Sequence, residues 1–428
     1  MQQTSALSSP DDLSPAPPQP RRAGRWLRRS VFAQLAKMTQ GCVTLVDAEG
    51  VHPFGQVSAA CPLRATVTIH DPNAYWRLAL RGSIGVAEGY MEGEWTCDDL
   101  PALVRIFVLN QDALLGLEKG LTRLIMPLLR LLYARRDNNR RGSRANIAAH
   151  YDLGNEFYRL FLDDTLMYSA AIFPTPQTGL REASIAKNDR ICRKLELNPN
   201  DHLLEIGAGW GGFALYAAQH YGCRVTTTTI SQEQYQLACE RVREAGLQDR
   251  ITVLCQDYRD LRGSYDKLVS IEMIEAVGER HLSGYFRACA QLLKPQGMML
   301  LQAITIADQK YQQYRREVDF IQYYIFPGGF LPSLSAIADK LAHSTDFRIF
   351  HLEDIGAHYA TTLRHWRQRF LANLEQVRAL GFPESFIRMW EYYLCYCEGG
   401  FRERTIGTVQ LLLTKPQCRR DAIIPALS

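Results

Sequence analysis

The sequence predicts an α/β fold, a parallel sheet with helices on both faces, together with a smaller α+β domain at the N-terminal end. Beyond about residue 146, short apolar strand-like runs alternate with helix-like runs, which is the pattern of βαβ units. A chain of 428 residues is longer than one core usually needs, so two domains are expected. The composition, 46% hydrophobic and 22% charged, is ordinary for a globular protein.

Four regions are expected along the chain. Residues 1–25 are rich in Ser, Pro and Gln and are predicted to be a disordered tail. Residues 26–132 form the predicted N-terminal domain, residues 133–145 a basic linker, and residues 146–428 the predicted α/β domain.

The N-terminal domain should contain a hairpin, a further strand and a helix. The stretch CVTLVDAEGVHPFG (42–55) is typical of a hairpin, and LRATVTIH (63–70) of a strand. A helix is predicted within 98–117, where Asp98 or Asp99 can cap its first turn.

A second apolar stretch, LTRLIMPLLRLLYARR (121–136), carries arginines and a proline that would kink a helix. A packed helix between domains and a helix lying on a membrane surface are both compatible with it.

Arginines gather at residues 21–30 and 134–144, although the net charge is only +4. This small net charge gives no argument for nucleic-acid binding. The two basic stretches are either solvated linkers or a face that meets anionic lipid head groups.

The hydrophobicity and the cysteine content of the sequence further predict a cytoplasmic protein. No apolar run is long enough to span a bilayer, and the N-terminus lacks the apolar core of a signal peptide. The eleven cysteines are scattered, and the close pair Cys395 and Cys397 lacks metal-ligand spacing, so reduced thiols and no metal are expected.

Five strands are predicted in the α/β domain. They are HLLEIG (202–207), CRVTTTTI (223–230), ITVLCQD (251–257), YDKLVSIE (265–272) and GMMLLQAITI (297–306). Helix-like segments lie between them, as a parallel sheet requires.

A glycine-rich turn follows the first of these strands. Gly207, Gly209 and Gly212 fit G-x-G-x-x-G, the turn of Rossmann-like folds that by itself suggests a dinucleotide. The second strand, however, is followed by no acid before Glu233, whereas a nicotinamide site needs one there for a ribose hydroxyl. Glu205 instead precedes the first glycine, which gives the E-x-G-x-G arrangement of class I Rossmann-like S-adenosylmethionine (SAM) methyltransferases. The glycines would let the backbone approach the methionine and ribose of SAM, and a carboxylate at Glu205 would favour the cationic ligand.

An adenine contact is expected after the third strand. Asp257 can accept a hydrogen bond from the adenine amine, and Tyr258 is a candidate ring neighbour.

Several longer motifs resemble one family. They are HYDLGNEFYRLFLDDTLMYS, LLEIGAGWGG, TTISQEQYQLA, QDYRDL, SIEMIEAVG, YIFPGGFLPS, HYATTLRHW and CYCEGGFRER. Between about Asn146 and Lys415 the chain is similar to cyclopropane-fatty-acyl-phospholipid synthases and their mycolic-acid relatives. The stretch GVAEGYMEGEWTCDDL resembles the smaller domain of the bacterial lipid-acting members. The resemblance implies methyl or methylene transfer from SAM to the double bond of an unsaturated acyl chain within a phospholipid.

The resemblance also implies cofactor contacts. Tyr168 and Ser169 match a SAM-contacting pair, Gly207 and Gly209 the glycine turn, and Gln234 a ribose contact.

In this family a bicarbonate ion acts as the base that deprotonates the methylated cation. Glu275, Tyr359 and the backbone of Ile304 match ligands of that ion. Cys397 matches a cysteine assigned to the active site, with a buried structural thiol as the alternative.

Two positions depart from the family pattern. Ala170 stands where the family has a bicarbonate-contacting cysteine, and Gln302 where it has a histidine. Gln302 can donate and accept but cannot be cationic, so bicarbonate is expected to bind more weakly, or to be replaced by water or by Glu275. The product could therefore shift from cyclopropane towards a methyl-branched or methylene chain, a furan precursor.

Two other readings stay open: a small-molecule SAM methyltransferase on the same fold, and a SAM- or lipid-binding protein without catalysis. The expected partners are unsaturated phospholipid chains and an anionic membrane surface with peripheral association at its cytoplasmic face, with no nucleic acid. The resemblance adds a possible homodimer.

Overall fold

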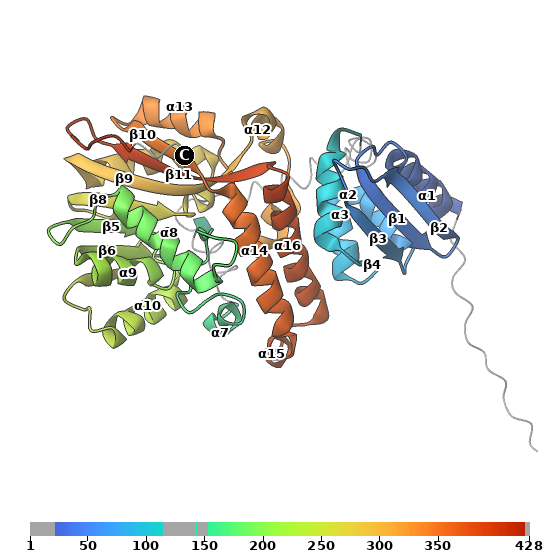
Figure 1. Ribbon diagram of the computed structural model, residues 1–428, viewed down its shortest axis with the longest axis horizontal. Helices are drawn as coiled ribbons and strands as arrows, with labels where there is room; N and C mark the ends of the chain where they lie inside the picture. Colours follow the sequence, from blue (N-terminus) through green and yellow to red (C-terminus); the bar gives the residue numbers. More distant parts are fainter. Residues whose placement is uncertain (1–21, 114–137, 139–141, 144–152, 424–428) are drawn as a thin grey trace, which may run out of the picture.

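The computed structural model describes residues 22–113, 138, 142–143 and 153–423, and Figure 1 shows two sheets joined by helices. Residues 1–21 of the predicted tail, most of the basic linker and the apolar stretch 121–136 lie outside the described residues, whereas residues 22–25 of that tail are helical.

Within the described residues, the N-terminal unit is a four-stranded sheet in the order β2-β1-β3-β4 with three α-helices. Its elements are α1 (Arg22–Leu35), β1 (Gly41–Asp47), β2 (Gly50–Gln56), β3 (Arg64–Ile69), α2 (Asn73–Met91), β4 (Trp95–Cys97) and α3 (Leu100–Leu109). The predicted hairpin is confirmed, since β1 and β2 pair antiparallel across a tight turn. Of the two candidate caps, Asp99 caps α3 by accepting from the N–H of Ala102 at 2.9 Å.

The second sheet has seven strands in the order β10-β11-β9-β8-β5-β6-β7. The strands are β5 (His202–Ile206), β6 (Arg224–Thr229), β7 (Ile251–Cys255), β8 (Tyr265–Ile271), β9 (Leu293–Ile306), β10 (Arg348–Asp354) and β11 (Ile406–Thr414). The five predicted strands are all present and run parallel.

One edge of the sheet is antiparallel, a feature that the sequence did not indicate. β11 pairs antiparallel with β9, and β10 pairs antiparallel with β11. Helices α12 (Asp308–Tyr314) and α13 (Leu334–Ser344) lie between β9 and β10, and α14 (Gly356–Ala372), α15 (Leu374–Ala379) and α16 (Glu384–Arg402) lie between β10 and β11. A helix between two strands is the usual sign of a parallel crossover, so the alternation of elements did not indicate an antiparallel edge.

Helices cover both faces of this sheet (Figure 1). The described α-helices of this part of the chain are α7 (Asn155–Arg159), α8 (Leu180–Lys194), α9 (Gly212–Tyr221), α10 (Gln232–Glu244), α11 (Leu282–Leu292), α12 (Asp308–Tyr314), α13 (Leu334–Ser344), α14 (Gly356–Ala372), α15 (Leu374–Ala379) and α16 (Glu384–Arg402). The mixed, helix-covered sheet is the predicted Rossmann-like α/β architecture.

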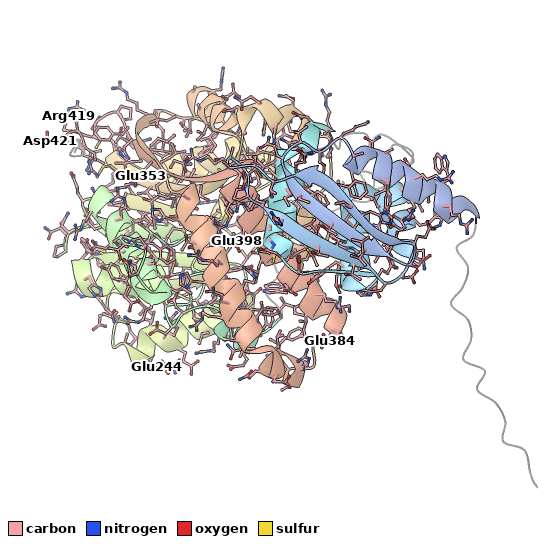
Figure 2. The ribbon with its side chains drawn as sticks, turned by 45° about the vertical axis from the view of Figure 1, so that its right-hand side comes forward. Glu244, Glu353, Glu384, Glu398, Arg419 and Asp421 are labelled. Carbon is pink, nitrogen blue, oxygen red and sulfur yellow. The ribbon has the colours of Figure 1, made fainter. Side chains whose placement is uncertain are left out.

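Helix α16 lies against the N-terminal unit, where it packs on α2 and α3 (Figure 1). Gly399 sits where the helices meet, because a Cβ there would come within 2.5 Å of the Val104 side chain. On the other side, Glu398, labelled in Figure 2, is paired with Arg402 on α16 and Arg367 on α14.

Polar contacts join the two parts of the chain across the same boundary. Tyr90 donates to Glu391 at 2.8 Å, and Arg105 donates to Glu403 at 2.5 Å. Among the described residues, no helix combines the length and apolar character needed to cross a bilayer.

Candidate active site

A cavity of about 1400 Å³ extends from the carboxyl ends of the central strands to the interior of the N-terminal unit. All eight residues predicted to bind the cofactor line it: Tyr168, Ser169, Glu205, Gly207, Gly209, Gln234, Asp257 and Tyr258. Of the five predicted catalytic residues, Glu275, Ile304, Tyr359 and Cys397 line it, whereas Gln302 does not.

The glycine turn forms one wall of this cavity. The N–H groups of Gly207 and Ala208 both donate to the carbonyl of Thr228 on β6, at 3.0 and 2.9 Å, which fixes the turn against the sheet. Gly209 has a φ of +50°, and a Cβ built there would meet no atom within 4 Å. The backbone at Gly209 therefore borders open space, as close approach of a ligand requires.

Glu205 lies beneath the turn, on β5, together with a buried lysine that the sequence did not single out. Its carboxylate accepts from Thr227 at 2.6 Å, and burial raises the pKa of Glu205 to about 8. Lys187 on α8 is fully buried, donates to the hydroxyl of Ser169 at 3.2 Å, and has its pKa lowered to about 8 by desolvation. The site thus holds a buried carboxyl group and a buried amine, and a cation bound beside them would lower the pKa of both.

The adenine end is built around an ion pair. Arg259 binds both oxygens of Asp257, at 2.8 and 2.6 Å, so a ligand amine would share a carboxylate that already has a guanidinium partner. Tyr258 lies beside this pair, and its ring packs edge-on against Tyr285. Gln234 is held by Thr229, which donates to its side-chain oxygen at 2.8 Å.

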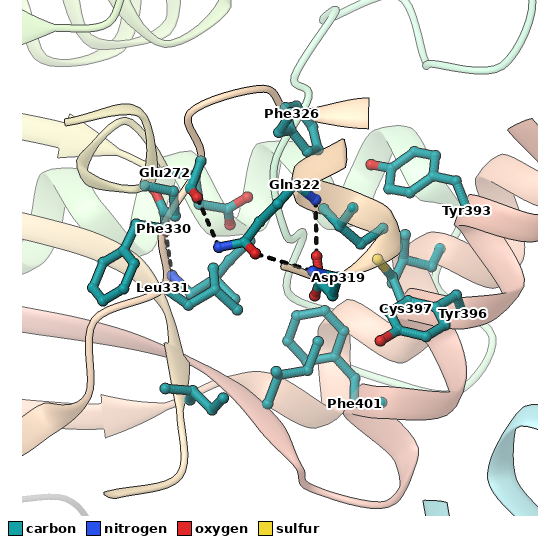
Figure 3. A pocket seen from close by; sticks show the side chains of 18 of the residues that line it. Glu272, Asp319, Gln322, Phe326, Phe330, Leu331, Tyr393, Tyr396, Cys397 and Phe401 are labelled. Atoms are coloured by element: carbon teal, nitrogen blue, oxygen red, sulfur yellow. Dashed lines mark hydrogen bonds between the residues drawn. The ribbon is translucent and has the colours of Figure 1, made fainter. Parts of the chain in front are cut away.

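Aromatic side chains surround the middle of the cavity. The hydroxyls of Tyr168 and Tyr393 are 2.9 Å apart, and the ring of Tyr168 lies near those of Trp366 and Phe326. Figure 3 shows Tyr393 and Cys397 on the same helix, facing the pocket. Burial raises the pKa of Cys397 well above that of a free thiol, so the group is a neutral thiol at the cavity wall.

Across the pocket from this helix lies Glu272, a carboxylate that the sequence motifs did not indicate (Figure 3). It accepts from the backbone N–H of Ala170 at 2.9 Å, from Gln302 Nε2 at 2.8 Å and from the Tyr359 hydroxyl at 2.8 Å. Its own backbone has a φ of +49°, a left-handed conformation that costs a non-glycine residue about 1 kcal/mol.

A chain of hydrogen-bonded side chains fixes which way the amide group of Gln302 points. Lys194 donates to the oxygen of Gln410 at 2.8 Å, so the Gln410 amide nitrogen faces Gln302 and donates to its oxygen at 3.0 Å. The nitrogen of Gln302 is thereby left to face Glu272. Glu353, labelled in Figure 2, anchors Lys194 at 2.6 Å.

A second carboxylate, Glu275, lies three residues further on. Its Oε1 accepts from the backbone N–H of Ile304 at 2.5 Å, and its buried Oε2 has no hydrogen-bond partner within the described residues. Burial, and then the charge of Glu272, raise the pKa of Glu275 to about 8. Since Glu272 receives three donors and Glu275 one, the shared negative charge is best placed on Glu272.

These contacts do not fit a bicarbonate ion. The donors that the resemblance assigned to that anion, at Tyr359 and the backbone of Ile304, are already bound to the carboxylates of Glu272 and Glu275, respectively. Gln302, which stands in place of the family's histidine, is likewise bound to Glu272. A further anion would also lie beside two buried carboxyl groups, which like-charge repulsion opposes.

The motif SIEMIEAVG contains both Glu272 and Glu275, and the resemblance indicates only Glu275. One signal was present, since Glu272 immediately follows β8 and the carboxyl ends of parallel strands are where sites form. Lys187 had no such signal, because a lysine on a helix is ordinarily solvent-exposed.

Comparison with known proteins agrees with this geometry. The sequence model described as mycolic acid cyclopropane synthetase matches residues 138–411, which is more than half of the chain. The chain belongs to this family. It is therefore a SAM-dependent methyltransferase, as the glycine turn and its surroundings predicted.

Two relatives match most of the chain. Tuberculostearic acid methyltransferase UfaA1 of Mycobacterium tuberculosis is 40% identical over 365 residues, 83% of this chain and 85% of its own. Cyclopropane-fatty-acyl-phospholipid synthase of Escherichia coli K12 is 38% identical over 354 residues, 82% of this chain and 88% of its own.

Among solved structures, mycolic acid cyclopropane synthase CmaA1 complexed with SAH and CTAB is 32% identical with a TM-score of 0.60. It covers 64% of this chain and 98% of its own. The cyclopropane synthase MmaA2 of Mycobacterium tuberculosis gives the same TM-score and coverage at 30% identity. The predicted family and fold are confirmed.

Proposed function

We propose that this methyltransferase transfers the methyl group of SAM to a carbon–carbon double bond in an unsaturated acyl chain of a phospholipid. One observation carries the proposal: the cavity that begins at the glycine turn continues into an apolar branch inside the N-terminal unit. The branch is lined by Val31, Leu35, Val43, Leu45, Val67 and Ile69. A long apolar chain suits such a path, whereas a small polar substrate would leave it unused.

The names of the relatives support a lipid substrate. UfaA1 is named for a fatty acid, and the Escherichia coli relative for the acyl chains of phospholipids. Both names concern lipid acyl chains, while the two differ in the product they specify.

The chemistry fits the central part of the cavity. An alkene is a weak nucleophile and a sulfonium methyl is a strong electrophile, so the protein must chiefly align the two and exclude water. Methyl transfer leaves a carbocation on the chain. The rings of Tyr168, Phe326 and Tyr393 offer π faces and edges around the space where that cation would form.

We further propose peripheral association with an anionic membrane surface. Helix α1 carries Trp26, which is 65% exposed, between the exposed residues Arg25 and Arg29. Arginines beside an exposed indole are suited to the interface of a bilayer with negatively charged head groups.

The test uses the purified full chain, methyl-deuterated SAM and vesicles of dioleoyl phosphatidylglycerol, with dipalmitoyl phosphatidylglycerol as the matched lipid without a double bond. Mass spectrometry of the released fatty acids should show label only from the dioleoyl vesicles. Two retained deuterons indicate a cyclopropane or a methylene group, which derivatisation of double bonds separates, and three indicate an intact methyl branch. Absence of label in every lipid, with SAM still bound, would refute the proposal in favour of a small-molecule substrate or a non-catalytic role.

A further inference from the structure

The cavity wall contains two carboxyl groups in different hydrogen-bonding states. Glu272 accepts three hydrogen bonds, all from neutral donors, and these occupy three of the roughly four acceptor positions of its two oxygens. Glu275 accepts one from a backbone N–H, and its second oxygen is without a partner. One acceptor position thus stays open on Glu272.

Two of the three donors to Glu272 lie on its side away from the cavity. Ala170 and Gln302 are fully buried and do not line the cavity, whereas Glu272 and Tyr359 do. The carboxylate of Glu272 therefore stands between Ala170 and Gln302 on one side and the space where the acyl chain would react on the other. The charged groups around it are Glu275, three residues further on, and the buried Lys187, and Tyr359 is the titratable donor.

Resting on the proposed function, we infer that Glu272 is the catalytic base that removes a proton from the methylated acyl chain, as a carboxylate built into the protein. The π electrons of the alkene form the new C–C bond to the methyl carbon, and the S–CH₃ bond breaks with its electron pair remaining on sulfur. Glu272 then takes one proton. The C–H electron pair closes a cyclopropane ring if the proton leaves the new methyl group, or forms a double bond if it leaves a carbon next to the cation. The products are the altered chain, S-adenosylhomocysteine and one proton, so no oxidant or reductant is needed.

The position of the carboxylate explains the two departures noted in the sequence. Once a side-chain carboxylate is present, Gln302 needs only to donate one hydrogen bond, and position 170 contributes its backbone N–H. A cationic histidine or a cysteine side chain is not required for these contacts.

The first test is the variant Glu272→Gln on dioleoyl vesicles. Loss of a general base predicts a fall in turnover of about 100-fold or more. Calorimetric titration should show SAM affinity within about threefold of the wild type. Turnover within about fivefold of the wild type would overturn the inference.

The second test separates chemistry from structure. Glu272→Gly removes the carboxylate and suits the left-handed backbone at this position, so this variant should fold. Added formate or bicarbonate should raise the turnover of this variant at least about tenfold, whereas chloride should not. Absence of rescue in a folded variant that binds SAM would contradict the role as a base.

The third test concerns the wild type alone. Its turnover should be the same in buffer stripped of carbon dioxide and in buffer with added bicarbonate, and a dependence on bicarbonate would overturn the inference. Because wild-type turnover is measured first on the same vesicles, failure of the proposed function shows there, and failure of this inference shows in the variants and in the bicarbonate dependence.

Discussion

At the scale of single residues, the site is governed by how protons are held on buried groups at the cavity wall. Glu205 and Glu275 have pKa values raised to about 8, and the pKa of Glu272 is also raised, with burial as the first cause for each. The hydrogen bonds from Gln302, Ala170 and Tyr359 act in the opposite direction on Glu272. Small changes in these donors therefore decide which carboxyl group is ionised.

Replacing Tyr359 by Phe removes one donor to the ionised form of Glu272 and should raise its pKa. A hydrogen bond to a charged group contributes about 1.5 kcal/mol, or about one pKa unit. The rising limb of turnover against pH should therefore move by up to about one unit towards higher pH. Tyr216→Phe, which removes the same hydroxyl from a residue away from the cavity, should leave the profile in place. A shift towards lower pH would contradict the assignment.

Binding of SAM should release protons. The pKa of Glu205 is raised to about 8 and that of Lys187 is lowered to about 8, and a bound sulfonium cation would lower both. Since fewer protons are then held in the complex, SAM affinity should rise as pH increases through about 7 to 8. S-adenosylhomocysteine, whose sulfur is neutral, should show little of this dependence.

Calorimetry in buffers with different ionisation enthalpies counts the released protons. Glu205→Gln removes one of the two groups and should reduce the count. Equal proton release on binding of both ligands would show that the cation does not lie near Glu205 and Lys187.

At the scale of elements, helix α16 does two things at once. One part of it carries Tyr393 and Cys397 at the cavity, and another packs Gly399 against α3 of the N-terminal unit. The close approach of two helices depends on a residue without a side chain at that point.

Gly399→Ala should lower the thermal unfolding temperature. The added methyl would lie 2.5 Å from Val104 Cγ1 and 3.0 Å from its Cβ, and such overpacking costs about 1–3 kcal/mol. Gly284→Ala on α11 is the matched control, because nothing lies within 4 Å of its added methyl. Higher helix propensity should make this control neutral or stabilising by up to about 1 kcal/mol. Equal unfolding temperatures for the two variants would show that α3 and α16 can separate without cost.

At the scale of the whole molecule, the N-terminal unit supplies both part of the cavity and the proposed membrane contact. Its apolar branch is continuous with the methyltransferase site, and α1 presents Trp26 among exposed arginines.

Trp26→Ala should weaken binding to vesicles that contain phosphatidylglycerol, on the order of tenfold, because an interfacial indole is lost. Trp76→Ala is the matched control: Trp76 is 36% exposed, and its neighbour Arg77 is paired with Glu94 at 2.8 Å. Sedimentation with vesicles measures both variants, and raised salt should weaken the wild type. Identical binding of Trp26→Ala and wild type would remove α1 from the proposed membrane contact.

The sequence by itself determined the features that depend on neighbours in the chain. Alternating apolar runs specified five parallel strands, E-x-G-x-G specified the turn beside Glu205, and an acid before an apolar helix gave the cap at Asp99. The sequence motifs also indicated Glu275 and Tyr359, which the structure brings to one cavity.

Only the tertiary structure decided what surrounds Glu272. Its three donors lie 102, 30 and 87 positions away in the chain and converge only when β8, β9 and α14 pack together. The antiparallel edge of β10 and β11 and the apolar branch in the N-terminal unit likewise join distant segments. A local sequence pattern carries no information on contacts between distant segments, because the hydrogen-bond donors and cavity walls come from segments that only the folded chain brings together.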